Sequence, residues 1–440
     1  WELQAFLKAA NADHTKHFGA AVDIDGDTIV VGQPDDRANQ ATITNGSTAT
    51  TNGASGNSGA VFVYKRSGTS WSQQAYIKAS NVGSVDRFGL EVDLDGNTLA
   101  VGAPYEDSNQ TTITNGTSAS SDNSIEDAGA VYVFIRSGNN WSQQAYIKAK
   151  NATGRDDSTS PAKKAHHFGA TLTLDGDTLA VGVPEEQSAS TSIINGTNTA
   201  TDIASSDQRG AVYVYKRTGS NWAQEAYIKP INTSVVGRFG FDIDLSGDSL
   251  AVGAPYEKST QTTITNGTTA STECCSYNSG AVYIYKRTGV NWAQEAYLKT
   301  KNHSHFLFGN GVSLDGNTLV VGMSGDKSNQ TTISYGRYSS ADTSLEDAGA
   351  VQVFSKVNNL WTQEAYIKSS NIDAYDRFGS EGNMDYSYSG GMLMLDGNTI
   401  VVGVPNEDSN QTTITNGPTS SANNSNSGSG AVFVYLKDSN

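Results

Sequence analysis

Residues 88–104, FGLEVDLDGNTLAVGAP, contain two short runs of alternating apolar and polar residues on either side of a turn. The first run is Phe88 to Leu94 and the second is Thr98 to Pro104. Asp95-Gly96-Asn97 between them is typical of a tight hairpin turn. Since alternation with a period of two is typical of strands, the stretch predicts a two-stranded antiparallel hairpin.

The residues that follow predict two more strands. After a long polar segment comes the apolar run 130–134, AVYVF, then Ser-Gly-Asn-Asn, then the alternating run from Trp141 to Lys148. One unit of this sequence therefore predicts four antiparallel strands.

The same unit recurs along the whole chain. The six tryptophans are spaced by 70, 70, 81, 70 and 69 residues, and each opens a version of W-x-Q-x-A-Y-I-K. A Phe-Gly pair and a G-A-V segment recur in step with them. The six units begin near Phe18, Phe88, Phe168, Phe239, Phe308 and Phe378.

Repeated four-stranded units of this kind predict an all-β fold, a six-bladed β-propeller in which each blade buries its faces against its neighbours. Residues 1–440 then form a single domain. The last unit lacks its Trp strand, whereas the chain begins with an isolated one, Trp1 to Lys8. We expect residues 1–8 to be the closing strand of blade six.

The repeat resembles the FG-GAP repeats of the integrin α-subunit propeller and of many bacterial surface and secreted proteins. The resemblance covers nearly the whole chain and lies in the Phe-Gly pair, the hairpin and the V-G-A-P segment, as at 101–104 and 252–255. There are six units where integrin propellers have seven, and unit five reads Val-Gly-Met-Ser at 321–324 without the proline. The resemblance implies an extracellular protein, secreted or at the cell surface, that acts in recognition or adhesion.

Calcium is the cofactor that this resemblance brings into question. Repeats of the family that bind Ca²⁺ carry a D-x-D-x-D-G loop in the first hairpin, long enough to supply six to eight oxygen ligands. Here the corresponding turn is only Leu94-Asp95-Gly96-Asn97 or its equivalent. We interpret Asp25, Asp95, Asp175, Asp315 and Asp396 as turn formers and expect no cofactor; calcium is possible but is not supported by such short turns.

Composition excludes some classes of partner. The net charge of −16 repels nucleic acid and anionic lipid headgroups, so we expect no nucleic-acid partner. No run approaches the length of about 18 apolar residues that a membrane span needs, so we expect no membrane insertion. Cys274 and Cys275 are adjacent and cannot join distant segments; they are interpreted as loop residues, with a vicinal or an intermolecular disulfide as alternatives.

The connections between the second and third strands of each unit are 24 or 25 residues long. Their near-constant length and a shared Thr-Ile-Thr-Asn-Gly centre argue against disorder and indicate a small hairpin whose isoleucine docks on the rim. Propeller topology puts these loops on the same rim as the connections between units, here called the long-loop face. They form either an architectural crown or a polar surface for glycans or protein partners. Sequons on them, such as Asn109, Asn115 and Asn266, permit glycosylation without indicating it.

Two insertions break the symmetry of the repeat and give the candidate ligand site. Unit three has a 19-residue connection at 149–167, and unit six has about 11 extra residues at 381–391. Units three and six lie opposite each other in a six-membered ring, so the insertions can meet over the axial channel, although both can equally be tolerated loop insertions. The candidate ligand-binding residues are Arg155, Asp157, Lys163, His166, His167, Asp376, Asp385, Tyr386 and Tyr388.

All six histidines lie in connections between units, as pairs in units one, three and five. Units two, four and six place Arg87, Arg238 and Arg377 directly before the phenylalanine. Imidazoles that converge on the axis could hold a transition metal, but ligand atoms must come within about 2.1 Å of the ion, so ordinary loop histidines are the preferred interpretation.

No nucleophile elbow, zinc motif or phosphate-binding loop occurs, and the recurring residues build strands, so we expect no enzymatic activity. The leading hypothesis is a recognition or adhesion propeller that binds a protein or glycan through its long-loop face. The alternative is a structural building block of a surface assembly or filament, formed by self-association through the long loops. A glycan-cleaving enzyme is a third and weaker hypothesis.

Overall fold

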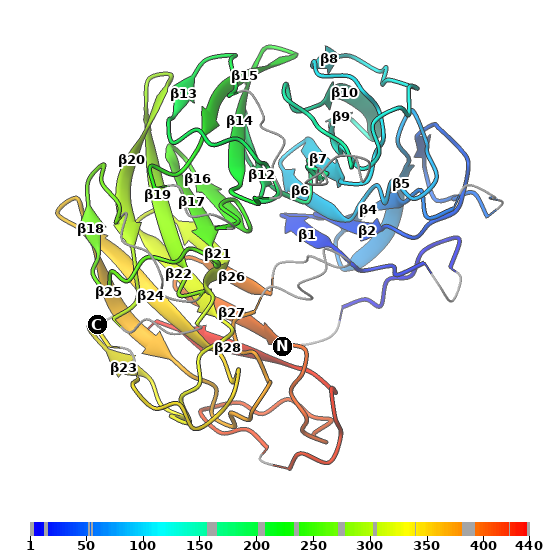
Figure 1. The fold of residues 1–440 in the computed structure, drawn as a ribbon. Coiled ribbons are helices and arrows are strands. Elements are labelled where there is room, and N and C mark those ends of the chain that lie inside the picture. Colours follow the sequence, from blue (N-terminus) through cyan, green and yellow to red (C-terminus); the bar gives the residue numbers. More distant parts are fainter. Residues whose placement is uncertain are drawn as a thin grey trace.

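The computed structural model describes the chain except for residues 1–3, 13–15, 52, 54–55, 156–164, 201–206, 233–236, 272–277, 302–305, 339, 381–391, 422 and 438–440. Six antiparallel sheets follow one another around an axis, and the described residues form no helix (Figure 1). Within this described part there is consequently no apolar helix of the length that crossing a bilayer requires. The all-β, six-bladed propeller predicted from the repeat is confirmed.

Each blade is one sheet, with the strand that is first in sequence at the inner edge. The strands of blades one to three are β1 (Val22–Asp25), β2 (Thr28–Gln33), β3 (Thr44–Asn45), β4 (Ala60–Ser67), β5 (Ser70–Ile77), β6 (Glu91–Asp95), β7 (Thr98–Ala103), β8 (Thr114–Asn115), β9 (Ala130–Ser137), β10 (Asn140–Ile147), β11 (Thr171–Asp175), β12 (Thr178–Val183), β13 (Ile194–Asn195), β14 (Ala211–Thr218) and β15 (Asn221–Ile228). Those of blades four to six are β16 (Ile243–Ser246), β17 (Ser249–Ala254), β18 (Thr265–Asn266), β19 (Ala281–Thr288), β20 (Asn291–Leu298), β21 (Phe308–Asp315), β22 (Thr318–Met323), β23 (Ser334–Tyr335), β24 (Ala350–Val357), β25 (Leu360–Ile367), β26 (Leu393–Asp396), β27 (Thr399–Val404) and β28 (Ala431–Leu436).

Blades one to five have five strands, where the sequence predicted four. The fifth is the two-residue strand at the centre of the long loop, which pairs with the outer edge of the Trp strand, as Thr44 with Tyr76 and Asn45 with Ala75. The predicted small hairpin is therefore wrong: the Thr-Ile-Thr-Asn segment adds to the blade. It covers a sheet edge that would otherwise present unpaired backbone groups to solvent.

The apolar core lies between blades. One cluster joins Val61, Val63 and Ile77 of blade one to Phe88 and Tyr132 of blade two, and four further clusters repeat this joint as far as blade six. Strand alternation explains the arrangement, because each central strand sends successive side chains to opposite neighbouring blades.

Glycines permit the blades to approach closely beside the axis. A Cβ on Gly102 of blade two would lie 2.0 Å from the carbonyl oxygen of Gly169 in blade three, and Gly169 itself has a φ of +95°. The Phe-Gly pair and the glycine of V-G-A-P are thus two sides of one joint.

Polar contacts reinforce each joint at its outer edge. Trp141 Nε1 of blade two donates to Gln74 Oε1 of blade one at 3.0 Å. Asn45, from the fifth strand of blade one, accepts from the backbone nitrogen of Trp141 at 2.7 Å and donates to its carbonyl oxygen at 3.3 Å. The same two hydrogen bonds join Asn115 to Trp222, Asn195 to Trp292 and Asn266 to Trp361.

Blade six has three described strands, β26, β27 and β28, and the face it would turn to blade one is exposed (Figure 1). Val432 and Val434 are 67% and 66% exposed, whereas their equivalents in blade two, Val131 and Val133, are fully buried. Residues 4–8 form no strand and residues 1–3 lie outside the described part of the chain, so closure of blade six by Trp1 to Lys8 stays a prediction.

The opposite wall of this opening belongs to blade one. Val22 and Ile24 of β1 are 56% and 55% exposed, whereas the equivalent Val92 and Leu94 are each 5% exposed. We call the opening between β1 and β28 the seam.

Candidate functional site

Polar and aromatic side chains lie around part of the axis on the long-loop face. They come from two positions of the repeat, the residue before Phe-Gly and the residue after the proline of V-G-A-P, in blades one to four, and from the first of these positions in blade six. We call this set the mouth belt: His17, Asp35, Arg87, Tyr105, His167, Glu185, Arg238, Tyr256 and Arg377.

The backbone at the first of these positions holds the side chains in place. His17, Arg87, His167, Arg238, Leu307 and Arg377 all have φ between 50° and 56°. Non-glycine residues rarely adopt this left-handed conformation, and it recurs directly before the Phe-Gly pair in all six blades. The fold therefore presents side chains of three types, histidine, arginine and leucine, from one repeated backbone geometry.

Neighbouring belt residues contact one another from blade to blade. Arg87 Nε lies 3.9 Å from Asp35 Oδ1 of the preceding blade, and its guanidinium lies 5.2 Å from the centre of the Tyr105 ring. His17 Nδ1 also contacts Asp35. The belt thus begins as an alternation of positive, negative and aromatic groups.

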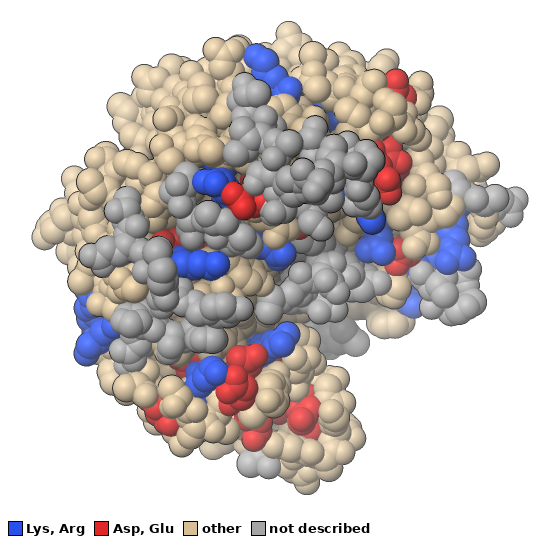
Figure 2. Space-filling view, in the orientation of Figure 1, with Lys and Arg blue, Asp and Glu red and all other residues tan. Residues whose placement is uncertain are grey.

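Blades three and four continue the alternation. His167 packs edge-on against Tyr105 at 5.0 Å and pairs through Nδ1 with Glu185 at 3.0 Å. Arg238 lies 4.9 Å from the centre of the Tyr256 ring. Figure 2 shows basic side chains on both sides of the middle of this face, several of them beside acidic ones. Arginine over aromatic rings beside carboxylates is a surface suited to binding, because one group meets charge and the next meets apolar surface.

Carboxylates line the inner strands below the belt and bind the next blade. Asp23 accepts from the backbone nitrogen of Leu94 at 2.6 Å, and Asp93 accepts from that of Leu174 at 2.8 Å. Burial raises the pKa of Asp93 well above its ordinary range, and the negative charge of Asp23 adds to the effect. Burial also raises the pKa of Asp242 to about 7 and that of Asp244 to about 6.

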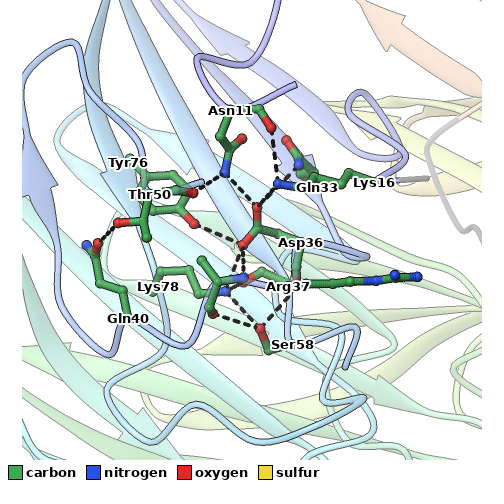
Figure 3. A network of polar contacts seen from close by, with 12 residues as sticks. Asn11, Lys16, Gln33, Asp36, Arg37, Gln40, Thr50, Ser58, Tyr76 and Lys78 are labelled. Carbon is green, nitrogen blue, oxygen red and sulfur yellow. Dashed lines mark hydrogen bonds and ion pairs between the residues drawn. The ribbon is translucent and has the colours of Figure 1, made fainter. Parts of the chain in front are cut away.

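A second polar group is buried inside every blade from one to five. In blade one, Asp36 accepts from Lys78 Nζ at 3.1 Å, from Tyr76 Oη at 2.9 Å and from Asn11 Nδ2 at 2.8 Å, with Lys16 Nζ at 3.4 Å (Figure 3). The acid–lysine pair recurs as Glu106–Lys148, Glu186–Lys229, Glu257–Lys299 and Asp326–Lys368. Because these groups are sealed inside the blades, we assign them to the framework.

Sequence reasoning missed both the acid–lysine pairs and the pairing within the belt. A signal for the first was present: an acid lies two residues after the V-G-A-P proline position in all six units, and a lysine ends the Trp run of each of units one to five. For the belt, position was the only clue, because its side chains differ from unit to unit.

The structure places four of the predicted site residues. His167 belongs to the mouth belt, whereas His166 is fully buried and Arg155 is exposed on the loop. Asp376 is 2% exposed and accepts from the backbone nitrogen of Asp373 at 2.8 Å, and burial raises its pKa to about 7. Asp376 therefore orders its own turn. Asp157, Lys163, Asp385, Tyr386 and Tyr388 lie outside the described residues, so a meeting of the two insertions over the axis stays a prediction, and so does the state of Cys274 and Cys275.

The described residues offer no metal-binding cluster. No group of three or more His, Cys, Asp or Glu in this part of the chain could hold a metal ion. The carboxylates of the hairpin turns bind backbone instead: Asp25 Oδ2 accepts from Gly96 N at 2.6 Å and Asp315 Oδ2 from Gly397 N at 2.8 Å.

Comparison with known families identifies part of the repeat. The model of the FG-GAP repeat matches residues 1–64 and 71–134. These are FG-GAP repeats. The other four units carry the same Phe-Gly pair and G-A-V segment, and the glycine of the G-A-V segment in each of units one to five forms a bridge with the phenylalanine of the next unit.

No curated protein matches this chain. Among solved structures, an acylaminoacyl peptidase in complex with Z-Gly-Gly-Phe-chloromethyl ketone is similar at 9% identity with a TM-score of 0.39. The alignment covers 88% of this chain and 43% of the peptidase. At this level the similarity gives no indication of activity.

Proposed function

We propose that this protein is a recognition or adhesion propeller, secreted or held at the cell surface, that binds a protein or glycan through its long-loop face. The proposal includes no catalysis. One observation carries it: the side chains of the mouth belt differ from blade to blade, whereas the backbone conformation that presents them is the same. The residue before Phe-Gly is His, Arg, His, Arg, Leu and Arg in blades one to six, while its φ stays between 50° and 56°.

Such a division is what a binding protein needs. Rigid strands fix the positions, and the side chains that differ supply specificity. The grouping of arginine, tyrosine and carboxylate favours a polar ligand with some apolar surface, which describes both protein loops and glycans.

The test compares binding before and after loss of the belt. Immobilised extracellular proteins and a glycan array would be probed with the wild type and with an Arg87→Ala/Tyr105→Ala variant. Arg136→Ala is the matched control, because Arg136 lies at the opposite rim, where it donates to Asn97 at 2.8 Å and lies 5.2 Å from the Trp141 ring.

We expect the belt variant to lose binding and the control to keep it. A Tyr386→Ala/Tyr388→Ala variant tests whether the blade-six insertion contributes. Binding that survives the belt substitutions would contradict the proposal.

Self-association is a second candidate function, favoured by one observation. The seam leaves apolar side chains of β1 and β28 exposed on complementary faces of one molecule. Such faces could join copies head to tail. Light scattering over a range of concentrations tests this role, and a monomer at every concentration would exclude it.

A further inference from the structure

The mouth belt is interrupted at blade five. The position after the V-G-A-P proline, which carries Asp35, Tyr105, Glu185 and Tyr256 in blades one to four, is Gly325, and the position before Phe-Gly is Leu307. At blade five, the first of these positions therefore has no side chain and the second has an apolar one.

A small hollow, open to solvent, lies at this interruption between blades four, five and six. It is lined by Phe241, Pro255, Tyr256, Leu307, Asn310, Ser324, Arg377 and Ser380. Half of these residues are aromatic or apolar, and among the polar ones Arg377 carries the charge.

Arg377 occupies the same repeat position as Arg87, but a glycine replaces the acidic residue that Arg87 contacts in the preceding blade. In blade two, Arg87 reaches Asp35 of blade one and stacks on Tyr105, but Gly325 offers Arg377 no side chain. Among the described residues its guanidinium has one ionic neighbour, Asp347 at 4.0 Å. Arg377 side-chain exposure is 35%, so the group is reachable from the hollow.

Tyr256 supplies the adjoining wall. Its ring packs edge-on against Phe241 at 6.3 Å and carries Arg238 on its face at 4.9 Å. Burial raises the pKa of the Tyr256 hydroxyl, and the positive charges of Arg238 and Arg377 partly offset this rise. An anion bound to Arg377 would therefore sit beside an aromatic surface that can hold an apolar stem.

We propose that this hollow binds a carboxylate side chain, glutamate or aspartate, from a loop of a protein partner, with Arg377 as its ligand. A guanidinium fork matches a carboxylate in geometry. One arginine is insufficient for a doubly charged phosphate, and the net charge of −16 disfavours a polyanion. The inference rests on the proposed function and specifies the ligand chemistry of part of the same face.

The test uses the full chain and a small probe, Ac-(4-fluoro)Phe-Glu-NH₂, followed by fluorine NMR titration. Ac-(4-fluoro)Phe-Gln-NH₂ is the neutral probe of the same shape, and glucuronate distinguishes a sugar carboxylate from a peptide one. Arg377→Gln is the test variant. Arg136→Gln is the matched control, because Arg136 lies at the opposite rim, where it donates to Asn97 at 2.8 Å.

We expect the glutamate probe to bind the wild type at least tenfold more tightly than it binds Arg377→Gln, since a hydrogen bond to a charged group is removed. Arg136→Gln should keep the wild-type affinity. Equal binding of the glutamine probe, or binding of glucuronate without the peptide, would overturn the inference.

The two proposals fail separately. If the wild type binds protein ligands through the mouth belt but ignores the dipeptide, only the carboxylate inference is wrong. If the Arg87→Ala/Tyr105→Ala variant also binds every ligand normally, the proposed function is wrong as well.

Discussion

Tyr64 of blade one donates a hydrogen bond through its hydroxyl to the carbonyl oxygen of Lys8 at 2.9 Å. Tyr435 of blade six makes the same contact at 3.3 Å with Lys368, which ends the Trp strand of blade five. Asn11 likewise binds Asp36 of blade one at 2.8 Å as Asn371 binds Glu407 of blade six at 2.7 Å. Residues 8–11 therefore lie against blade one as the end of a preceding blade does at the other joints.

This relationship leads to a prediction for the seam. In blade five, Val351 pairs with Ile367 and Val353 with Ala365, and the repeat maps these pairs onto Val432 with Leu7 and Val434 with Ala5. We expect a Leu7→Cys/Val432→Cys variant, made with Cys274 and Cys275 replaced by serine, to form an intramolecular disulfide and to melt at a higher temperature. Mass spectrometry and non-reducing gels measure the bond.

The matched control is Phe6→Cys/Val432→Cys. Adjacent strand residues point to opposite faces, so this pair should not form the bond. A disulfide ladder of multimers in the Leu7 variant would show that the strand is donated to another copy. If deletion of residues 1–8 left the melting temperature unchanged, these residues would close blade six neither in their own molecule nor in another copy.

Trp141→Ala should be among the most destabilising single substitutions. Trp141 is 2% exposed, packs in the joint between blades one and two and donates to Gln74. Loss of a buried tryptophan typically costs about 3 to 5 kcal/mol, and we expect that fall in the free energy of unfolding by urea titration. Gln74→Ala removes only the hydrogen bond and should cost about 1 kcal/mol. Equal effects of the two substitutions would show that the joint depends on the hydrogen bond rather than on packing.

Stability should increase as the pH falls from 8 to about 5.5. Burial raises the folded-state pKa of Asp242 to about 7 and of Asp244 to about 6, above the ordinary value of 3.8. Between these values the folded state binds more protons than the unfolded state, so the free energy of unfolding falls as the pH rises. Melting temperatures at pH 5.5 and pH 8 measure this difference.

An Asp242→Asn variant should lose part of this pH dependence and melt higher than the wild type at pH 8. Asp396→Asn, at an exposed turn of blade six, is the control and should leave the slope unchanged. A wild-type melting temperature that is higher at pH 8 than at pH 5.5 would show that other groups dominate.

Chelation should leave the propeller unaffected. The turn carboxylates of Asp25, Asp175 and Asp315 accept backbone hydrogen bonds from the next blade, so they hold the ring together without a cation. We expect the same melting temperature with and without EDTA. A fall of several degrees that Ca²⁺ restores would contradict this and would point to the acidic starts of the long loops, such as Glu106 and Asp107.

The repeat made the blade architecture predictable because backbone pairing and burial impose the same residues six times. Phe88 and Gly169 can be interpreted from sequence alone, since their partners occupy fixed places in the next unit. The fifth strand was not predictable in this way. A two-residue pairing such as Thr44–Asn45 with β5 leaves no alternation in the sequence to detect.

The candidate site was less predictable for a related reason. His167 and Arg87 were noticed because they precede Phe-Gly, but their partners Glu185, Asp35 and Tyr105 come from another position of the repeat and sometimes from another blade. Pairing between two variable positions leaves no periodic signal. The hollow beside Arg377 arises from a missing side chain at Gly325, which a search for functional residue types does not find.

The indole hydrogen bonds at the outer edge of the blades run in one direction along the chain. The tryptophan of each later blade donates to the earlier one, as Trp222 does to Gln144 and Trp361 to Glu295, and every joint uses two different surfaces. The contacts at one joint therefore do not depend on the number of blades in the ring. A whole unit could be duplicated or lost in evolution without changing the chemistry of any remaining joint, and only the angle between neighbouring blades would decide whether the new ring closes.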